Sequence, residues 1–136
     1  MEKKRLYILL FVITLLIVIG YSVASKSTKI PNIEGMDYSL WKSDLYGCNS
    51  DRENLIHLII SNKEKFLRFN QNQMIYILGK PENQTLYSRG QTFFYYYIKY
   101  HPSCGTENAL SDAEQIKLEI RFDALNRSKD IYVYNL

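Results

Sequence analysis

One segment of this 136-residue chain, QIKLEIRFDA at residues 115–124, alternates regularly between apolar and charged side chains. The apolar positions are Ile116, Leu118, Ile120 and Phe122, and the charged positions between them are Lys117, Glu119 and Arg121. Because successive side chains of a β-strand point to opposite faces, this pattern predicts a strand with one buried face and one solvated face. Such strands are typical of an antiparallel sheet that is covered on one side only.

Three further segments have the composition of strands: TLYS at 85–88, TFFYYYIKYH at 92–101 and DIYVYNL at 130–136. The second is rich in aromatic residues, which favour pleated surfaces. No helical crossover separates these strands, so each is expected to pair with its neighbour in the sequence as an antiparallel meander.

The aromatic strand has two faces, and its lysine indicates which one is buried. Lys99 shares a face with Phe93, Tyr95 and Tyr97, so the opposite face is expected to form the core. That core face carries Phe94, Tyr96, Ile98 and Tyr100. Phe93, Tyr95 and Tyr97 would then form an unusually large apolar patch on the open face, which makes them candidate partner-binding residues. The alternatives are that a loop or the tether covers these residues, that tyrosine simply suits a solvated strand, or that the facing is reversed.

The stretch FNQNQMIYILGKPE, residues 69–82, contains a glycine beside a lysine, which raises the question of a phosphate loop. Asn70 and Gln73 instead form a capping-box pattern, followed by apolar side chains at helical spacing. Gly79 stands at the expected C-cap, and Pro81 cannot continue a helix. A phosphate loop needs several glycines before the start of a helix, so the stretch predicts one short helix.

An earlier helix is expected to begin at Asp51 as its N-cap. Its apolar side chains recur at helical spacing, at Leu55, Ile56, Leu58, Ile59 and Ile60. Trp41, further upstream, is expected to anchor the core. The predicted fold class is α+β: two N-terminal helices packed on one face of a four-stranded antiparallel meander sheet, preceded by an N-terminal membrane segment.

The N-terminus combines three cations, Lys3, Lys4 and Arg5, with an uncharged run over residues 6–25. Cations on one flank of an apolar run indicate insertion into a membrane, with the cations inside. Residues 1–24 are therefore expected to be a retained transmembrane anchor or a cleaved signal peptide, and a buried core helix is a third possibility. Residues 25–35 have the composition of a tether, and residues 36–136 would form the exported α+β domain.

The two cysteines, Cys48 and Cys104, are expected to form a disulfide, because an even number of cysteines in a small exported domain usually does. In the loop-entropy model this crosslink would stabilise the domain by about 4 kcal/mol. Zinc binding together with His57 and His101 is an alternative, although the spacing matches no recognised finger or ribbon.

The pattern of a short helix ending in L-G-x-P, a strand with Y-x-Y and a strand with L-x-I-x-F-D resembles the small SmpA/OmlA-type lipoproteins of the outer-membrane barrel-assembly machinery. The same unit occurs, doubled, in β-lactamase inhibitor protein. The matching residues are Asn70, Gln73, Met74, Leu78, Gly79, Pro81, Tyr95, Tyr97, Leu118, Ile120, Phe122 and Asp123. The resemblance covers residues 70–134 and implies an envelope protein that binds other proteins. Those lipoproteins carry a lipid-modified cysteine after the signal, which this chain lacks.

The function expected from the sequence is non-enzymatic. The formal net charge of +3 falls to +1 without Glu2, Lys3, Lys4 and Arg5, so the domain has no strong attraction for nucleic acid. No arrangement of residues indicates catalysis, a metal or a cofactor. We expect a cell-envelope protein that binds an envelope or membrane protein through the open aromatic sheet face. It would contact the membrane through residues 6–24. A small-ligand-binding or sensory domain of an anchored protein is the alternative.

Overall fold

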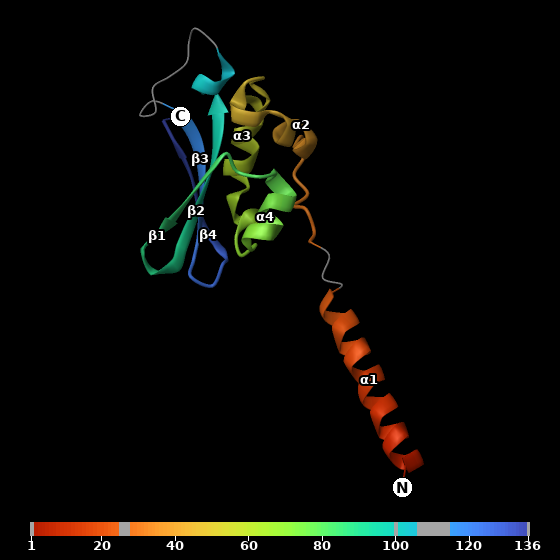
Figure 1. The fold of residues 1–136 in the computed structure, drawn as a ribbon. Helices are drawn as coiled ribbons and strands as arrows, with labels where there is room; N and C mark the ends of the chain where they lie inside the picture. Colours follow the sequence, from red (N-terminus) through yellow and green to blue (C-terminus); the bar gives the residue numbers. More distant parts are fainter. Residues whose placement is uncertain (1, 25–27, 100, 106–114, 136) are drawn as a thin grey trace.

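The computed structural model describes residues 2–24, 28–99, 101–105 and 115–135. Its elements follow the chain as a long N-terminal helix, a set of shorter helices and then four strands (Figure 1). The four strands form one antiparallel sheet, which confirms the predicted α+β class.

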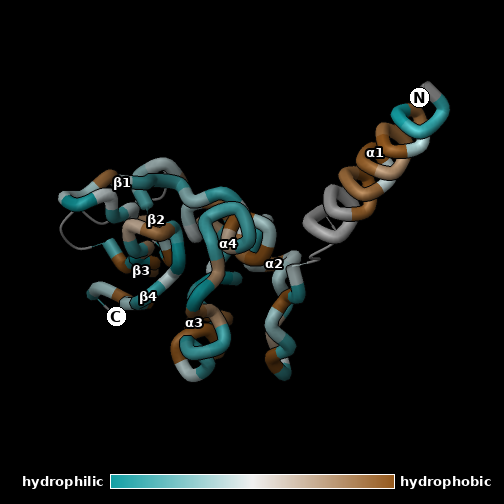
Figure 2. Tube along the Cα trace, turned by 90° about the horizontal axis from the view of Figure 1, so that it is seen from below, coloured by the Kyte–Doolittle hydropathy of each residue, from teal (hydrophilic) through white to brown (hydrophobic). Residues whose placement is uncertain are grey.

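Helix α1 (Glu2–Ala24) covers the apolar segment of the N-terminus. Its side chains are exposed throughout residues 3–18, and hydrophobic residues dominate the helix beyond its basic first turn (Figure 2). Among the residues that the structure describes, no helix has the length and apolar character needed to cross a bilayer.

Three further α-helices lie between α1 and the sheet in the sequence: α2 (Tyr38–Ser43), α3 (Asp51–Ser61) and α4 (Gln71–Leu78). The sequence predicted α3 and α4, two helices, but not the short helix α2 that carries Trp41. Asp37 caps α2 by accepting hydrogen bonds from the backbone N–H groups of Ser39 and Leu40 at 2.8 and 3.1 Å. Ile33, in the range 25–35 expected to be a tether, is buried in the core.

The prediction that Asp51 is the N-cap of α3 was wrong. Ser50, not Asp51, is the N-cap residue, and its side chain makes no capping hydrogen bond. The side chain of Asp44, which lies outside the helix, makes the capping hydrogen bonds instead. One of its carboxylate oxygens accepts from Asn49 N–H at 2.7 Å and the other from Arg52 N–H at 2.9 Å. A carboxylate contributed from elsewhere in the chain therefore satisfies N–H donors at the start of the helix.

Helix α4 begins and ends as its sequence predicts. Asn70 accepts from the backbone N–H of Gln73, and the Gln73 side chain accepts in return from the N–H of Asn70, which confirms the capping box. Gly79 ends the helix at φ +85, a conformation that favours glycine. The carbonyl of Gly79 accepts a hydrogen bond from the buried Tyr96 hydroxyl at 2.9 Å, which joins the helix end to the sheet.

The sheet contains β1 (Asn83–Tyr87), β2 (Gln91–Lys99), β3 (Ile116–Phe122) and β4 (Ser128–Tyr134), paired in that order. Its inner face packs against the helices. As expected, Phe94, Tyr96 and Ile98 are buried there, whereas Tyr100 lies outside the described residues. Side chains with at most 1% exposure fill the space between the layers: Trp41, Ile59, Phe66, Met74, Ile77, Leu78, Phe94, Tyr96, Ile98, Leu118, Ile120 and Phe122.

The predicted disulfide between Cys48 and Cys104 is present, with a Cα–Cα distance of 5.4 Å. It connects the loop before α3 to the short 3-10 turn Pro102–Cys104 beyond the end of β2, across 56 residues of sequence. Both sulfur atoms are thereby removed from the Cys–His set that the sequence offered for zinc.

Opening this disulfide should destabilise the domain. We expect the double substitution Cys48→Ser and Cys104→Ser to lower the free energy of unfolding by about 2–4 kcal/mol, because the unfolded chain loses a long crosslinked loop. Urea denaturation of the oxidised protein, the reduced protein and the double variant measures the effect. Reductant should not change the urea midpoint of the double variant. If reduction also left the urea midpoint of the native protein unchanged, the prediction would be contradicted.

Candidate protein-binding surface

The face of the sheet that points away from the helices carries an ordered set of aromatic and charged side chains. Strand register places Tyr95, Glu119 and Tyr132 in one row across three strands. A second row holds Phe93 and Arg121, and a third holds Tyr97, Lys117 and Tyr134. We call this set the outer sheet face: Tyr87, Phe93, Tyr95, Lys117, Glu119, Arg121, Tyr132 and Tyr134.

Arg121 organises the centre of the outer sheet face. Its guanidinium carbon lies 5.0 Å from the ring centre of Phe93 and 4.7 Å from that of Tyr132. It donates to the Glu119 carboxylate and, at 2.8 Å, to the Tyr134 hydroxyl. The hydrogen bond with Glu119 raises the pKa of Arg121. The cation therefore connects two aromatic rings and fixes a third through its hydroxyl.

Glu119 is the acceptor in this centre and is 5% exposed. It accepts from Arg121 and, at 3.3 Å, from the hydroxyl of Tyr134. Removal from water is costly for a carboxylate, and the cation beside it compensates. The result is a polar centre surrounded by rings, because Arg121 lies two residues along the same strand as Glu119 and Tyr134 lies on the neighbouring strand β4.

The exposed part of the outer sheet face consists of tyrosines at its two sides. Tyr87, Tyr132 and Tyr134 are 61%, 42% and 37% exposed. Tyr87 also stacks on Phe93 with ring centres 5.2 Å apart. These rings present apolar area and a hydroxyl together, the combination that is enriched in binding sites.

The three residues singled out from the sequence are less accessible than these tyrosines. All three lie on the outer side of the sheet, but Phe93 is only 9% exposed, beneath Tyr87 and Arg121. Tyr95 is half-buried, with the Lys117 ammonium 5.4 Å from its ring centre. Burial raises the pKa of the Tyr95 hydroxyl.

Tyr97, the third predicted residue, belongs to a different contact at the end of the sheet. Its ring lies 6.2 Å from that of Tyr46 and 4.1 Å from that of His101, and both cover it. Tyr46 has φ +59, an unusual conformation for a bulky residue, in the loop next to the disulfide. Tyr97 therefore lies on the same side of the sheet as Phe93 and Tyr95, in the row of Lys117, but its ring packs with Tyr46 and His101 at the end of that face.

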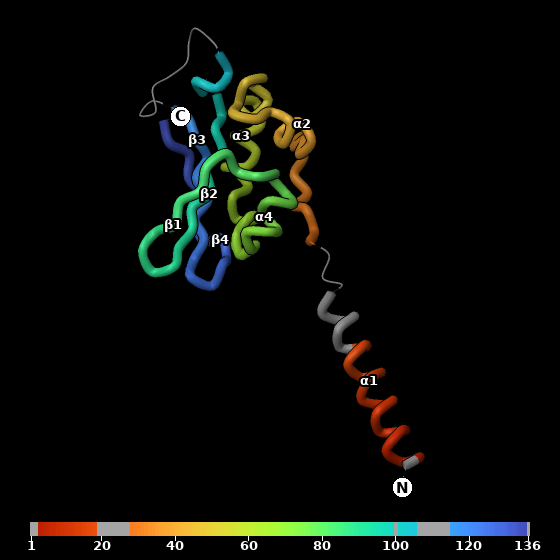
Figure 3. Tube along the Cα trace, in the orientation of Figure 1, coloured from red at the N-terminus to blue at the C-terminus, as the bar shows by residue number. Residues whose placement is uncertain are grey.

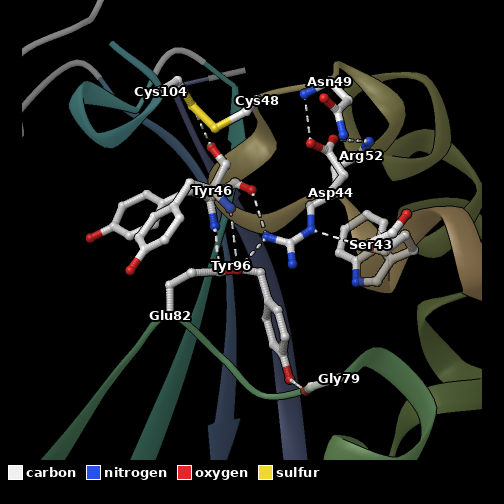
Figure 4. A network of polar contacts seen from close by, with 12 residues as sticks. Ser43, Asp44, Tyr46, Cys48, Asn49, Arg52, Gly79, Glu82, Tyr96 and Cys104 are labelled. Carbon is white, nitrogen blue, oxygen red and sulfur yellow. Dashed lines mark hydrogen bonds and ion pairs between the residues drawn. A yellow bond between two sulfur atoms is a disulfide. The ribbon is translucent and has the colours of Figure 1, made fainter.

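A second polar cluster lies inside the molecule, at the junction between the helices and the end of β2 (Figure 4). The Arg52 guanidinium donates to the Glu82 carboxylate at 2.8 Å, to Trp41 O at 3.0 Å and to Tyr97 O at 3.0 Å. The side chains of Arg52 and Glu82 are 1% and 3% exposed. We call Asp44, Arg52 and Glu82 the internal ion cluster.

The internal ion cluster stabilises the junction and offers no access to a substrate. The guanidinium carbon of Arg52 also lies 5.4 Å from the Trp41 ring centre and 5.7 Å from that of Tyr96. The guanidinium of Arg52 therefore has polar partners for its N–H groups and two aromatic rings close by. The sequence showed no sign of this cluster, because Arg52 and Glu82 are thirty positions apart and neither belongs to a recognisable motif.

The described residues hold no group of three or more histidine, cysteine or acidic side chains placed to bind a metal. Neither cysteine is a free thiol. The outer sheet face is thus the arrangement in the described part of the chain with the strongest features of a binding site. Comparisons with known protein families, curated proteins and solved structures find no match to this chain.

Proposed function

We propose that this chain is an exported, non-enzymatic protein of the cell envelope that binds a protein partner through the outer sheet face. The observation that carries the proposal is the exposure of Tyr87, Tyr132 and Tyr134 around a fixed Arg121–Glu119 centre. Tyrosines whose neighbours already hold them lose little conformational entropy on binding. They therefore suit recognition of a protein surface.

A flat surface favours a protein partner over a small ligand, which needs a concave site that encloses it. The alternative that we considered, a ligand cleft between helices and sheet, has less support. Large side chains such as Trp41, Phe94 and Tyr96 fill that layer. Nucleic acid is also disfavoured, because the outer sheet face pairs its cations with a carboxylate and with rings.

Export is supported by two independent features. The disulfide is typical of oxidising compartments, and the apolar segment at residues 6–24 follows three cations. We therefore propose that this segment takes the chain to the membrane and that the domain works beyond it, with an envelope or membrane protein as partner. The resemblance of residues 70–134 to the SmpA/OmlA-type lipoproteins supports the same assignment.

Site-specific photo-crosslinking in cells tests the proposal. A photoreactive phenylalanine analogue at position 132 should give one discrete adduct with an envelope protein. Tyr134→Ala should reduce the yield of that adduct about tenfold or more, because aromatic anchors at the centre of an interface contribute most of its affinity.

Position 76 provides the matched control. Tyr76 is 58% exposed and lies on α4, away from the sheet, so the same analogue there should give no such adduct. Identical adducts from positions 76 and 132, or an adduct at 132 that survives Tyr134→Ala, would contradict a role for the outer sheet face.

A further inference from the structure

Strand β1 is an edge strand without the usual protection against pairing. It bonds to β2 on one side only, and all five of its residues, Asn83–Tyr87, are exposed. Its sequence, NQTLY, contains no charge and no proline. Alternate N–H and C=O groups of such an edge point away from the sheet and can accept another strand. Figure 3 shows the hairpin of β1 and β2 at one side of the domain, away from α2 and α3.

The opposite edge of the sheet is protected. Strand β4 carries Lys129 and Asp130, whose side chains are 43% and 41% exposed. At its beginning, Ser128 N–H donates to Phe69 O and Ser128 O accepts from Arg68 N–H, both at 2.8 Å. Charge and a covering segment are two common ways to prevent edge pairing. The two edges therefore differ: β4 has charged side chains and a covering segment, whereas β1 has neither.

Leu86 gives a second indication that β1 has a partner. It pairs with Thr92 on the helix-facing side of the sheet, yet it is 82% exposed, because the helices do not cover it. Thr92 itself is 5% exposed. An apolar side chain that faces inward on an uncovered edge strand loses exposed area when a further strand is added beside it, and this stabilises the pairing.

From these features we infer that the chain forms a dimer in which β1 pairs antiparallel with β1 of a second copy. With Thr85 on the two-fold axis, Asn83 lies opposite Tyr87 and Gln84 opposite Leu86 of the other copy. The two sheets become one continuous eight-stranded sheet, because the four strands of each copy meet at β1.

The sequence of β1 fits a second copy of itself. No pair across the axis brings like charges together, because the strand has none. A β-branched residue stands at the centre, where strands favour it. The two Leu86 side chains lie diagonally across the axis on the same face, within reach of each other. This self-complementarity is what a symmetric interface requires.

The dimer does not rest on the proposed function. It uses the edge of β1, whereas the proposed partner binds the outer sheet face around Tyr132 and Tyr134. Either can fail while the other holds, since the oligomeric state and the crosslink at position 132 are separate measurements.

The mass of the full chain, measured by analytical ultracentrifugation in a detergent of known aggregate mass, tests the inference. The native chain should dimerise, and Leu86→Lys should weaken the dimer about tenfold, because it removes two apolar contacts and adds two charges near the axis. Leu125→Lys is the matched control: Leu125 is 71% exposed in the β3–β4 turn, and this change should leave the dimer constant unaltered. A monomeric native chain, or a dimer that Leu86→Lys leaves intact, would overturn the inference.

A cysteine crosslink provides a second readout that does not depend on weakening the dimer. Thr85→Cys places two thiols opposite each other at the axis, within disulfide distance of adjacent strands. Mild oxidation should convert most of this variant into a covalent dimer on a non-reducing gel. Leu125→Cys should give only background crosslinking. Equal yields from the two variants would refute pairing through β1.

Discussion

Replacing Arg52 with methionine should lower the free energy of unfolding by about 3–5 kcal/mol, because the change leaves a buried carboxylate without its cation. Glu82 is 3% exposed and would keep only two long hydrogen bonds, from Tyr46 N–H at 3.4 Å and Tyr97 N–H at 3.3 Å. Methionine retains much of the volume of the arginine side chain, so the loss reports the charge and its hydrogen bonds rather than a cavity. Urea denaturation of the disulfide-bonded protein measures it.

Arg127→Met is the matched control for this effect. Arg127 also pairs with a carboxylate, that of Asp123 at 3.5 Å, but its side chain is 54% exposed. An exposed pair contributes at most about 1 kcal/mol, so this variant should remain close to the native stability. Adding Glu82→Gln to Arg52→Met should recover part of the loss, because the two residues are coupled. Equal effects at positions 52 and 127 would show that burial of the pair is unimportant.

Replacing Gly47 with alanine should destabilise the protein by about 4 kcal/mol or more, which is exceptionally large for a single substitution. A Cβ atom at Gly47 would lie 2.1 Å from the carbonyl oxygen of Ile98, a backbone atom of β2 that cannot move aside as a flexible side chain can. Relief requires the loop to move off β2, which would disturb the adjacent disulfide at Cys48. Thermal unfolding of the oxidised variant measures the loss.

Gly105→Ala separates the steric effect from the conformational one. Gly47 and Gly105 have nearly the same backbone angle, φ +68 and φ +65, but a Cβ at Gly105 would meet no atom within 4 Å. The control should therefore show only the cost of a left-handed alanine, about 1–2 kcal/mol. If the two variants lost equal stability, close packing of the loop on β2 would not be the cause.

The parts of the fold that the sequence predicted are those specified by neighbouring residues. The alternation from Ile116 to Phe122 predicted β3, because a period of two is a local property of the backbone. The capping box of α4 needs only Asn70 and Gln73, three positions apart. The disulfide followed from there being only two cysteines to pair.

The parts that the sequence did not predict depend on contacts between distant segments. Asp51 has the right residue type for an N-cap, but Asp44 supplies the carboxylate because the preceding loop folds back over the helix start. Phe93 was expected to be exposed, yet Tyr87 and Arg121 cover it from the neighbouring strands. Arg52 would ordinarily be assigned to the surface, since arginine is rarely buried without a partner.

The sequence predicted which face of β2 is buried, but it did not predict which side chains share the opposite face or how exposed they are. The alternation placed Lys117, Glu119 and Arg121 on the wet side of β3, and the aromatic strand suggested rings beside them. The contribution of Tyr132 and Tyr134 depends on the register of β3 with β4, which the sequence alone does not provide. A Y-x-Y pattern in the last strand was the available signal for those two tyrosines.

The four strands are unequally secured, and this has a consequence for how the molecule opens. Within a single copy, the disulfide and the internal ion cluster hold the far end of β2, and the buried core holds β2 and β3, whereas β1 has one ladder of hydrogen bonds and the stacking of Tyr87 on Phe93. Strand β1 therefore forms the unit of lowest local stability in the sheet and can detach while the remaining strands stay folded. Detachment would remove Tyr87 from Phe93 and transiently uncover a ring that the closed molecule keeps from water.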